Sequence, residues 1–586
     1  MPRKLHTILS TREGGAVDSS GSSQPRRHIA LAAILMAALA VAALSAAEAP
    51  SVHTLPDGPF RSIDGTGNNH DHPNWGAVGG QLLRRIPAAY GDGGQTMVGA
   101  DRPSPRVISN AVVAQQSAPG QPNISNFIWM WGQFIDHDLD LTPSSAIAVP
   151  PFCGEVANVS VPAGDPIFDP HNTGSAVIDF CRSVFDPATG TSVTNPRQQI
   201  TVITSFIDAS NVYGSSPARA AWLRKNDGSG ELKTSIGDNG EVLLPHNTDG
   251  LPNGGDPRPT LFIAGDERAN ENNALTSMHT LFVREHNYWA RKIRESAHGT
   301  MSDDDIYLRA RAIVGAELQA ITYNEFLPAL LGPHAIPPYT GYHPNVNPGI
   351  ETMFSTASYR FGHTLLSHFL NRLGSDLKPI PQGPITLQEA FFNPAPVQQL
   401  GVDVYLRGAA HEQANRYDCF IVDDVRNFLI NDPMPGAFDL ASLNMQRGRD
   451  NGLPGYNVAR LGFGLTPKSG FGAINPTSPS VAASLSSVYT SVDDVDPWLG
   501  GICEKPVPGA IVGELVKTVV ADQFTRSRDG DRFYFGNIYP PQWVNYFNHL
   551  SLSDVIRRST SISKQQIQSN PFLLDGGDDH HHGEDD

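Results

Sequence analysis

The sequence has few cysteines and a shortage of basic residues. Its 586 residues contain four cysteines, Cys153, Cys181, Cys419 and Cys503, and none stands in a CxxC or CxxH spacing. So few and so scattered cysteines exclude a disulfide scaffold, and the missing spacings argue against zinc and thiol redox chemistry. The net charge of −17 argues against a surface for phosphates or anionic membranes, because both need clustered lysine and arginine. A nucleic-acid partner is therefore not expected.

Long apolar runs are also scarce, and the single one lies near the N-terminus. A polar lead reaches Pro25-Arg26-Arg27, an almost unbroken apolar run spans 29–47, and Ser45-Ala46-Ala47 offers a small-residue exit. This layout is typical of an export signal. An uncleaved anchor is the alternative, because the run is close to the ~20 residues that span a bilayer. We expect residues 1–49 to direct the protein to a secreted or extracytoplasmic location, without membrane association once the signal is removed.

No internal repeat or long low-complexity linker divides the rest of the chain. Its length would suit about four domains of roughly 150 residues each, but the sequence is equally compatible with a single large domain. With 40% hydrophobic and 17% charged residues, the chain can bury a large core. The tail, 576–586, is acidic and polar; we expect it to be solvated, with metal binding by His580 to His582 as the alternative.

Strict strand alternation is short and rare, so we expect a mainly α fold with little β structure. The long irregular connections would be supplied by 55 glycines and 47 prolines, beginning with an extended arm over 52–120. From Ile124 onward the apolar residues fall at the i, i+3, i+4 spacing of a buried helix face. Further helical patterns are predicted at 274–297, 303–331, 355–373 and 508–525.

The first helix ends in the stretch WGQFIDHDLDLTP, which is unusually rich in ionisable residues. Gln133 and His137, four residues apart, share a helix face, with Asp136 beside them and Asp138 turned about 100° away. A buried histidine beside an amide suits general base work, because its pKa lies near neutrality. A satisfied core or capping histidine is the alternative interpretation of this segment alone.

A second stretch, TSFIDAS at 204–210, places oxygen atoms at alternate positions. Thr204, Asp208 and Ser210 carry oxygen-bearing side chains, and the Phe206 carbonyl fills the gap between them. Such a set suits calcium, which takes six to eight oxygen ligands, and Asp138 would complete its charge. A polar turn with a capping aspartate is the alternative.

Three later stretches carry further candidates. GDERANENNALTSMHTLFVRE places Arg268 and Glu271 at the head of a predicted helix, where a surface ion pair is the plainer interpretation. SYRFGHTLLSHFL places His363 on a predicted helix that buries Phe361, Leu365 and Phe369. LNMQRGRDNGLPGYN contains Asn444 and Arg447.

Taken together and in this order, the five stretches resemble the animal-type haem peroxidases of the peroxidase–cyclooxygenase superfamily. The resemblance begins at RSIDGTGNNHDHPNWG (Arg61 to Gly76) and ends near SKQQIQSNPF (Ser563 to Phe572). It implies one large mainly α peroxidase domain over 50–575. It also implies a secreted enzyme that reduces hydrogen peroxide and oxidises iodide, bromide, thiocyanate and small phenols.

The resemblance assigns two residues to the iron ligation and three to catalysis. His363 would be the proximal iron ligand, and Asn444 would hydrogen-bond its other ring nitrogen and fix its orientation. His137 resembles the distal base that moves the peroxide proton. Arg268 would stabilise the charge that develops as the O–O bond breaks. Gln133 resembles the distal amide that orients water or halide.

Other matched positions would hold the cofactors. Asp136 and Glu271 correspond to the carboxylates that form esters with haem methyl groups, which implies a covalently linked derivative of haem b. Arg360 and Arg447 stand where the family pairs cations with the haem propionates, and Asp140 would lie near them.

The resemblance also supports one calcium ion. Its ligands would be Asp138, Thr204, the Phe206 carbonyl, Asp208 and Ser210, and it would tie the 204–210 loop to the helix that carries the catalytic histidine.

The chain departs from the family pattern at three places. Asn272 stands where one mammalian member forms a methionine sulfonium link to haem, so we expect little chloride oxidation. Gly67 replaces a cysteine of the mammalian enzymes, which removes that bridge and leaves Cys153 and Cys181 as a candidate pair. Cys419 and Cys503 have no mammalian counterpart, which leaves their pairing open.

Two other functions are compatible with the same sequence. A fatty-acid dioxygenase of the superfamily would need a tyrosine three residues before the proximal histidine, where this chain has Arg360, with Tyr359 one residue out of register. A non-catalytic secreted adhesion or matrix protein is the other alternative. The intact Gln133, His137, Arg268 and His363 and the lack of an RGD tripeptide argue against it.

Overall fold

The computed structural model describes residues 49–115, 119–144, 153–254, 257–428 and 438–574. The expected acidic tail, and all but the last residue of the expected export segment, lie outside these residues. Among the described residues, no helix combines the length and the apolar character needed to cross a membrane.

Helices form the framework, which confirms the prediction of a mainly α fold. The longer ones are α3 (Phe127–Leu139), α6 (Asn273–Ala297), α7 (Asp303–Ile321), α12 (Asp403–His411), α14 (Leu440–Asp450), α16 (Pro479–Val488), α18 (Glu514–Asp529), α20 (Pro541–His549) and α21 (Leu552–Ser559). Short helical segments connect them: η2 (Val52–Thr54), α2 (Pro105–Ile108), η3 (Ser109–Val113), α4 (Ser210–Tyr213), α5 (Pro217–Leu223), η4 (Thr322–Phe326), α8 (Leu327–Leu331), α9 (Thr352–Thr356), η5 (Ser358–Leu365), α10 (Leu387–Ala390), α11 (Ala395–Leu400), α13 (Asp423–Arg426), α15 (Tyr456–Gly462), η6 (Phe471–Ala473), η7 (Val492–Asp494), α17 (Pro497–Cys503) and α19 (Phe535–Ile538).

Strands are short and occur as antiparallel pairs in the described part of the chain. The pairs are β1 (Gly120–Ser125) with β8 (Gln413–Asn415), β2 (Val159–Ser160) with β3 (Val177–Ile178), β4 (Ser235–Ile236) with β5 (Val242–Leu243), and β6 (Phe369–Leu370) with β7 (Ile385–Thr386). These ladders join loops and do not form a central sheet.

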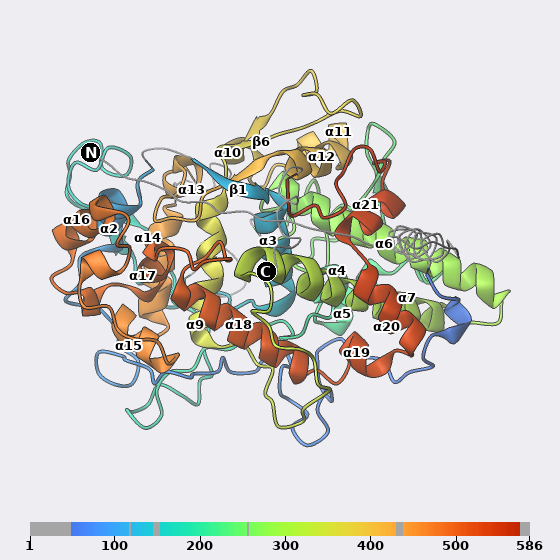
Figure 1. Cartoon of the computed structure of the whole chain (residues 1–586), viewed down its shortest axis with the longest axis horizontal. Helices are drawn as coiled ribbons and strands as arrows, with labels where there is room; N and C mark the ends of the chain where they lie inside the picture. The colour runs from blue at the N-terminus through green and yellow to red at the C-terminus, as the bar shows by residue number, and fades with distance from the viewer. Residues whose placement is uncertain (1–48, 116–118, 145–152, 255–256, 429–437, 575–586) are drawn as a thin grey trace, which may run out of the picture. The chain divides into compact units, whose positions relative to one another are not determined.

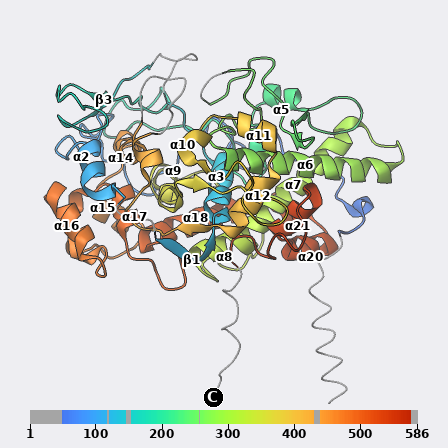
Figure 2. The same cartoon turned by 90° about the horizontal axis from the view of Figure 1, so that it is seen from above.

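Helix α3 lies at the centre of the fold. Figure 1 shows it between α6 and α7 on one side and α14 and α17 on the other, and Figure 2 shows the same order from above. Its aromatic side chains pack on α6: the Phe134 ring stacks on Phe282 with centroids 5.1 Å apart, and Trp131 meets Phe282 at 5.7 Å. A helix that is buried on every face belongs to a core, so its polar side chains need partners inside the protein.

The helices α6 and α7 begin where the sequence offers capping residues. The Asn272 side chain accepts from the amide of Leu275 at the start of α6. Ser302 and Asp305 form a reciprocal capping box at the start of α7. The helical pattern predicted over 303–331 is realised as α7, the π-helical turn η4 and α8.

The prediction of a continuous helix over 355–373 is wrong. The chain forms α9, breaks at Ala357 (φ −137°, ψ −70°), and continues as the 3₁₀ helix η5 with a kink at Arg360. Beyond η5 the backbone is extended and enters β6, so Phe369 is 43% exposed and not buried as predicted. Apolar spacing reports burial on one face, but it does not detect a break that local packing imposes.

Two other boundaries differ from prediction. The helix predicted over 508–525 begins at Glu514 and ends at Asp529, because Gly509 (φ +77°) is left-handed and turns the chain before it. Arg268 and Glu271 lie in a turn before α6 and not in the helix itself, where the Glu271 amide donates to the Arg268 carbonyl at 2.9 Å.

All four cysteines are paired. Cys153 is bonded to Cys181, which confirms the candidate pair, and Cys419 is bonded to Cys503. The second disulfide joins the segment after β8 to the end of α17, and it resolves the pairing that the sequence left open.

Candidate active site

A cavity of about 340 Å³ lies between α3, the turn before α6, and η5. Seven of the side chains predicted from the sequence line it: Gln133, Asp136, His137, Arg268, Glu271, Arg360 and His363. Much of the remaining wall is apolar and includes Trp129, Tyr359, Phe391, Phe392, Val425 and Leu440. A largely apolar cavity with a few convergent polar groups is the usual form of a small-molecule site.

His137 is buried near the C-terminal end of α3. Its Nδ1 lies 3.5 Å from Oδ1 of Asp266, and its Nε2 lies 3.9 Å from Oε2 of Glu271. Burial, together with the nearby Arg268 guanidinium, holds the pKa of His137 well below its ordinary value. The imidazole is therefore neutral and able to accept a proton, which is the first requirement of a general base.

Asp266 anchors Arg268 and faces His137. The Nε and Nη2 atoms of Arg268 donate to the two oxygens of the Asp266 carboxylate at 2.8 and 2.9 Å, and the Arg268 amide donates to Oδ1 at 2.8 Å. Burial alone would raise the pKa of Asp266, but the Arg268 charge holds it well below the usual range. Sequence reasoning gave this residue no role, although it stands two positions before Arg268. The signal that the sequence offered was an acidic residue two positions before an arginine that was assigned to the site.

The amide of Gln133 is fixed at both ends. Its Nε2 donates to Oε2 of Glu271 at 2.6 Å, and its Oε1 accepts from Nδ2 of Asn272 at 3.1 Å. Asn272 therefore has two tasks, because its own Oδ1 accepts from the Leu275 amide and caps α6. The prediction treated Asn272 only as the position of a missing methionine.

The Asp136 carboxyl faces the cavity beside Arg268. Its Oδ2 lies 3.4 Å from Nη1 of Arg268, and its side chain is 31% exposed. Burial raises the pKa of Asp136 to about 7 even though the Arg268 charge opposes the shift. The Glu271 side chain is 33% exposed, and burial likewise raises its pKa. Both carboxyl groups are thus accessible from the cavity.

His363 lies on η5 and lines the cavity. The Asn444 side-chain amide hydrogen-bonds its Nδ1 at 2.8 Å, and within the described residues its Nε2 has no hydrogen-bond partner. Burial, with a contribution from the Arg360 charge, lowers the pKa of His363 to about 3. A neutral imidazole with one nitrogen held by a partner and the other free is suited to metal ligation.

The predicted propionate partners are placed differently from one another. Arg360 lines the cavity, and its Nε donates to the Ser355 carbonyl at 2.9 Å. Arg447 is not among the cavity-lining residues, and its Nη1 donates to Oγ of Ser183 at 2.7 Å. Asp140 is buried, and the Ser355 hydroxyl donates to it. Of the two predicted cations, Arg360 is the one brought to the cavity wall.

The side chains of the predicted calcium ligands also come together, on a different face of α3 from His137. Oδ2 of Asp138 accepts from the amides of Asp208 and Ala209, each at 3.0 Å, and Oδ1 accepts from the Ser210 hydroxyl at 2.8 Å. The Thr204 hydroxyl donates to Oδ1 of Asp208 at 3.1 Å. Phe206 belongs to the same loop, with its side chain buried.

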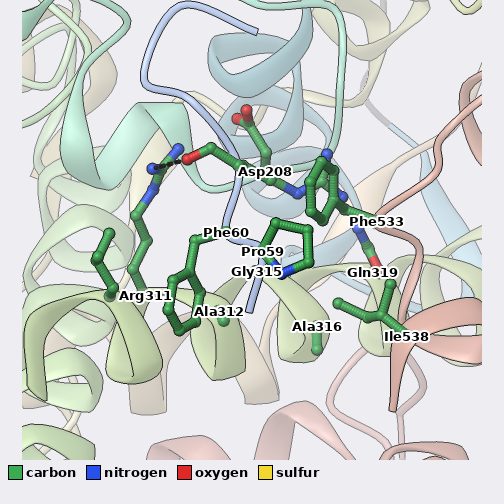
Figure 3. Close-up of a pocket in the computed structure, with 12 residues that line it drawn as sticks. Pro59, Phe60, Asp208, Arg311, Ala312, Gly315, Ala316, Gln319, Phe533 and Ile538 are labelled. Carbon is green, nitrogen blue, oxygen red and sulfur yellow. Dashed lines mark hydrogen bonds between the residues drawn. The ribbon is translucent and has the colours of Figure 1, made fainter. Parts of the chain in front are cut away.

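The chemistry of this cluster fits a cation. Oδ2 of Asp208 is buried without a hydrogen-bond partner. Burial and the adjacent Asp208 charge raise the pKa of Asp138 to about 8, so the two carboxylates repel each other. Burial also raises the pKa of Asp208, although the charge of Arg61 opposes it. Figure 3 shows the Asp208 carboxylate pointing away from Pro59 and Phe60 of the N-terminal arm.

The cluster is nevertheless poor in charged ligands. Within the described ranges, no group of three or more histidine, cysteine, aspartate or glutamate side chains is arranged to hold a metal. A calcium ion bound here would depend on two carboxylates and several neutral oxygens, which is a donor set that calcium accepts.

Comparison with known proteins gives a consistent result over nearly the whole chain. The model of the animal haem peroxidase family matches residues 60–572. The chain is 36% identical to peroxidasin of Drosophila melanogaster over 88% of its own length, and it spans 36% of that longer protein. It is also 36% identical to myeloperoxidase of Mus musculus, over 89% of this chain and 78% of the relative.

Solved structures show the same fold. Peroxidase A of Dictyostelium discoideum superposes with a TM-score of 0.80 at 31% identity, covering 88% of this chain and 100% of that one. A fatty acid alpha-dioxygenase of Arabidopsis thaliana superposes with a TM-score of 0.75 at 19% identity, covering 90% and 85% of the two chains. The second likeness concerns the fold alone.

Proposed function

Because the chain belongs to the animal haem peroxidase family, we propose that haem binds in the cavity lined by His137 and His363 and that hydrogen peroxide is reduced there. The family and the enzyme class expected from the sequence, a haem peroxidase, are confirmed at this level. The observation that carries the proposal is a single cavity with a neutral base beside Arg268 and a histidine with a free Nε2.

Each polar group at the cavity has a task in this reaction. When bound, haem supplies the iron at which peroxide is cleaved and its oxidising equivalents are held. His137 takes the proton from the peroxide oxygen that remains and delivers it to the oxygen that departs as water. Arg268, oriented by Asp266, stabilises the negative charge on the departing oxygen. Gln133 is held by Glu271 and Asn272 in position to orient a water molecule or a halide.

We propose that the haem is a covalently linked derivative of haem b. The support is that the carboxyl groups of Asp136 and Glu271 both reach the cavity, from α3 and from the turn before α6. An ester forms from a carboxyl group, and burial raises the pKa of both residues, that of Asp136 to about 7, which favours the neutral acid.

We propose one calcium ion in the Asp138 cluster. The support is the unpartnered Oδ2 of Asp208, buried beside a second carboxylate. The ion would fix the loop 204–210 to α3, one residue away from His137.

The proposed donors are iodide, bromide, thiocyanate and small phenols. The apolar wall, with Phe391 and Phe392, suits a planar aromatic donor, and Arg268 suits an anion. Asn272 cannot form the sulfonium link that the resemblance associates with chloride oxidation. We also propose that the protein is exported, on the basis of the apolar run at 29–47.

The test is oxidation of guaiacol and of bromide by the haem-loaded protein, with and without hydrogen peroxide. His137→Ala should lower peroxide-dependent turnover by about 10²–10⁴-fold, the usual contribution of a general acid–base group, while haem stays bound. The exposed His549 at the end of α20 provides a matched control, and His549→Ala should leave turnover unchanged. A haem-loaded wild-type protein that oxidises neither donor would refute the proposal.

The same assay addresses the alternative functions. A fatty-acid dioxygenase would consume oxygen with a long-chain fatty acid and would not need peroxide. Arg360 occupies the position where that mechanism needs a tyrosine, so no observation at the cavity favours it. A non-catalytic matrix protein would show neither activity.

A further inference from the structure

A short loop, 391–394, follows α10 and is hydrogen-bonded to the turn before α6. The amide of Phe392 is shared between two carbonyl groups of that turn, at 3.1 Å from the Asn270 oxygen and 3.3 Å from the Glu271 oxygen. This pair of contacts is called the loop clamp below. It holds the backbone of the residue whose carboxyl group faces the cavity and is a proposed site of a haem ester.

The two segments that the loop clamp joins are anchored elsewhere as well. The Asn393 side chain donates to the Glu389 carbonyl at 2.9 Å, which ties the loop to α10. The Asn273 side chain donates to the Asn393 carbonyl at 2.6 Å, which ties the loop to the first turn of α6. The Asn270 side chain exchanges two hydrogen bonds with the backbone of Phe262, at 2.9 and 2.7 Å. The clamp therefore connects two supported pieces of backbone.

Phe392 adopts an unusual backbone conformation to make these contacts. Its φ is +48°, in the left-handed region that glycine adopts readily and other L-residues adopt at a cost. Among the described residues other than glycine with a positive φ, Phe392 is the one that lines the cavity. Glycine would serve the backbone alone, so the ring in the cavity wall is a second requirement at this position. A strained residue that serves two such requirements is a candidate for a functional role.

The two proposed ester residues differ in what holds them in place. Asp136 lies within α3, where its carbonyl accepts from the Asp140 amide at 3.0 Å, so the helix fixes its backbone. Glu271 lies outside regular secondary structure, and its carboxyl Oε2 accepts from Gln133 at 2.6 Å. The position of Glu271 therefore depends on contacts such as the loop clamp, whereas the position of Asp136 does not.

We propose that Phe392 is a positioning residue, whose left-handed backbone clamps the turn before α6 and fixes the Glu271 carboxyl group for ester formation. The proposal rests on the proposed function, because it concerns the ester to haem. In that step one hydrogen peroxide accepts two electrons from a haem methyl group, and a Glu271 oxygen forms the new C–O bond. The hydrogen lost from the methyl group and the carboxyl proton join the peroxide, which leaves as two water molecules.

Three substitutions at position 392 separate the role of the backbone from that of the ring. Phe392→Gly keeps the amide and adopts a positive φ freely, and Phe392→Ala keeps the amide but resists a positive φ. Phe392→Pro lacks the amide and fixes φ at about −65°. Phe391, with φ −70° and ψ 126°, already has a conformation suited to a residue before proline. All three variants lack the ring, so differences among them report on the backbone.

Amide hydrogen exchange at residue 392 measures the opening of the loop clamp without any turnover. We expect protection of this amide to be roughly 5- to 30-fold lower in Phe392→Ala than in Phe392→Gly, which corresponds to the cost of one left-handed residue. Leu377 provides a matched control, because its φ is +60° and it does not line the cavity. Leu377→Ala and Leu377→Gly should differ from each other at residue 377 and leave the amide of residue 392 unchanged.

The second readout is the ratio of haem links to Glu271 and to Asp136, mapped by peptide mass spectrometry after peroxide exposure. We expect this ratio to be lower in Phe392→Ala than in Phe392→Gly, and the Glu271 link to be lost in Phe392→Pro. The Asp136 link should be kept in all three variants, and both Leu377 variants should show the wild-type ratio. General loosening of the fold would lower both links together, so the ratio isolates the position of Glu271.

The comparison of Phe392→Gly with Phe392→Ala decides the proposal even where Phe392→Pro fails to fold. Equal protection of the residue-392 amide in these two variants, or an equal ratio of links, would overturn the positioning role. A wild-type protein with neither link would refute the proposed esters. The clamp is then judged by the rate of the peroxide reaction, which should be slower in Phe392→Ala than in Phe392→Gly because Arg268 lies on the same turn. Equal rates would overturn the positioning role as well.

Discussion

Replacing Asp266 with asparagine should slow the reaction with hydrogen peroxide while haem remains bound. Asp266 does not line the cavity, but its carboxylate receives three hydrogen bonds from Arg268 and faces Nδ1 of His137 at 3.5 Å. Asparagine keeps one acceptor oxygen and turns an NH₂ group toward the guanidinium or the imidazole. Arg268 would then lose one charge-assisted bond and the carboxylate that fixes its direction.

The size of the effect follows from the bond that is lost. A hydrogen bond to a charged group contributes about 1.5–3 kcal/mol to a buried site. If that energy is expressed fully in the transition state, the rate falls by roughly 10- to 150-fold, since each 1.36 kcal/mol is tenfold. A mobile Arg268 would still reach the departing oxygen in part of the population, so the loss should not exceed the lower end of the 10²–10⁴-fold effect estimated for removing His137.

The assay is stopped-flow measurement of the bimolecular reaction with peroxide, followed at the haem absorbance band. Asp165→Asn provides the matched control, because the buried Asp165 also receives Nε and Nη2 of an arginine, Arg106, at 2.7 and 3.1 Å, outside the cavity. It should lower thermal stability without slowing the peroxide reaction. An Asp266→Asn protein as fast as wild type, or a control that is equally slow, would refute the assigned role.

The remaining predictions concern cofactors, donors and pH. After peroxide exposure, acidified organic solvent should leave haem on the denatured protein. Replacing Asp136 or Glu271 should leave one covalent link to haem, and replacing both should leave none. Complete extraction of haem from the wild-type protein would contradict the ester proposal. Asp138→Ala should release calcium and lower haem occupancy by loosening α3, and elemental analysis that finds no tightly held calcium in wild type would exclude the ion. Because Asn272 forms no sulfonium link, taurine chlorination at pH 7 should be far slower than bromination, and equal rates would show that this residue does not limit the haem. Burial raises the pKa of Glu325 from 4.5 to about 8, so the folded state favours the protonated side chain. The contribution of the protonated Glu325 to folding stability is complete below pH 4.5 and is lost as the pH rises toward 8. Glu325→Gln should therefore stabilise the protein by on the order of 3 kcal/mol near pH 7 in denaturant titrations, with little effect at pH 4, and a pH-independent difference would count against this reasoning.

The sequence predicted what depends on local pattern. The buried face of α3, the extent of α6 and the start of α7 follow from apolar spacing, and the structure confirms them, whereas α7 ends at Ile321 and not at residue 331. The apolar pattern over 355–373 led to the wrong prediction of one continuous helix. A break at Ala357 and a kink at Arg360 interrupt the helix but leave the spacing of the buried residues intact. Such breaks are decided by local side-chain contacts that the apolar pattern does not record, for example the bond from Nε of Arg360 to the Ser355 carbonyl five residues before it.

The site was predicted through resemblance more than through periodicity. The motifs singled out His137, Arg268 and His363, and the structure brings these three side chains to one cavity. The motif could not reveal that Asp266 connects Arg268 to His137, because that contact depends on side chains meeting across two segments. The bonds of Arg447 to the segment at Ser183 were invisible for the same reason.

Under the proposed function, the two hydrogen-bonding tasks of Asn272 would restrict a change toward chloride oxidation. A single change to methionine would place a sulfur near the cavity, but it would also remove the N-cap of α6, which typically costs about 1 kcal/mol. It would further free the Gln133 carbonyl that Asn272 now holds at 3.1 Å. A variant with the new link would begin with a weaker helix and a looser distal amide. A route to chlorination therefore needs a second substitution that restores the cap, for example serine or aspartate at a neighbouring position with a shifted helix start. Under the proposed function, a helix terminus would therefore help to restrict the halides that the protein oxidises.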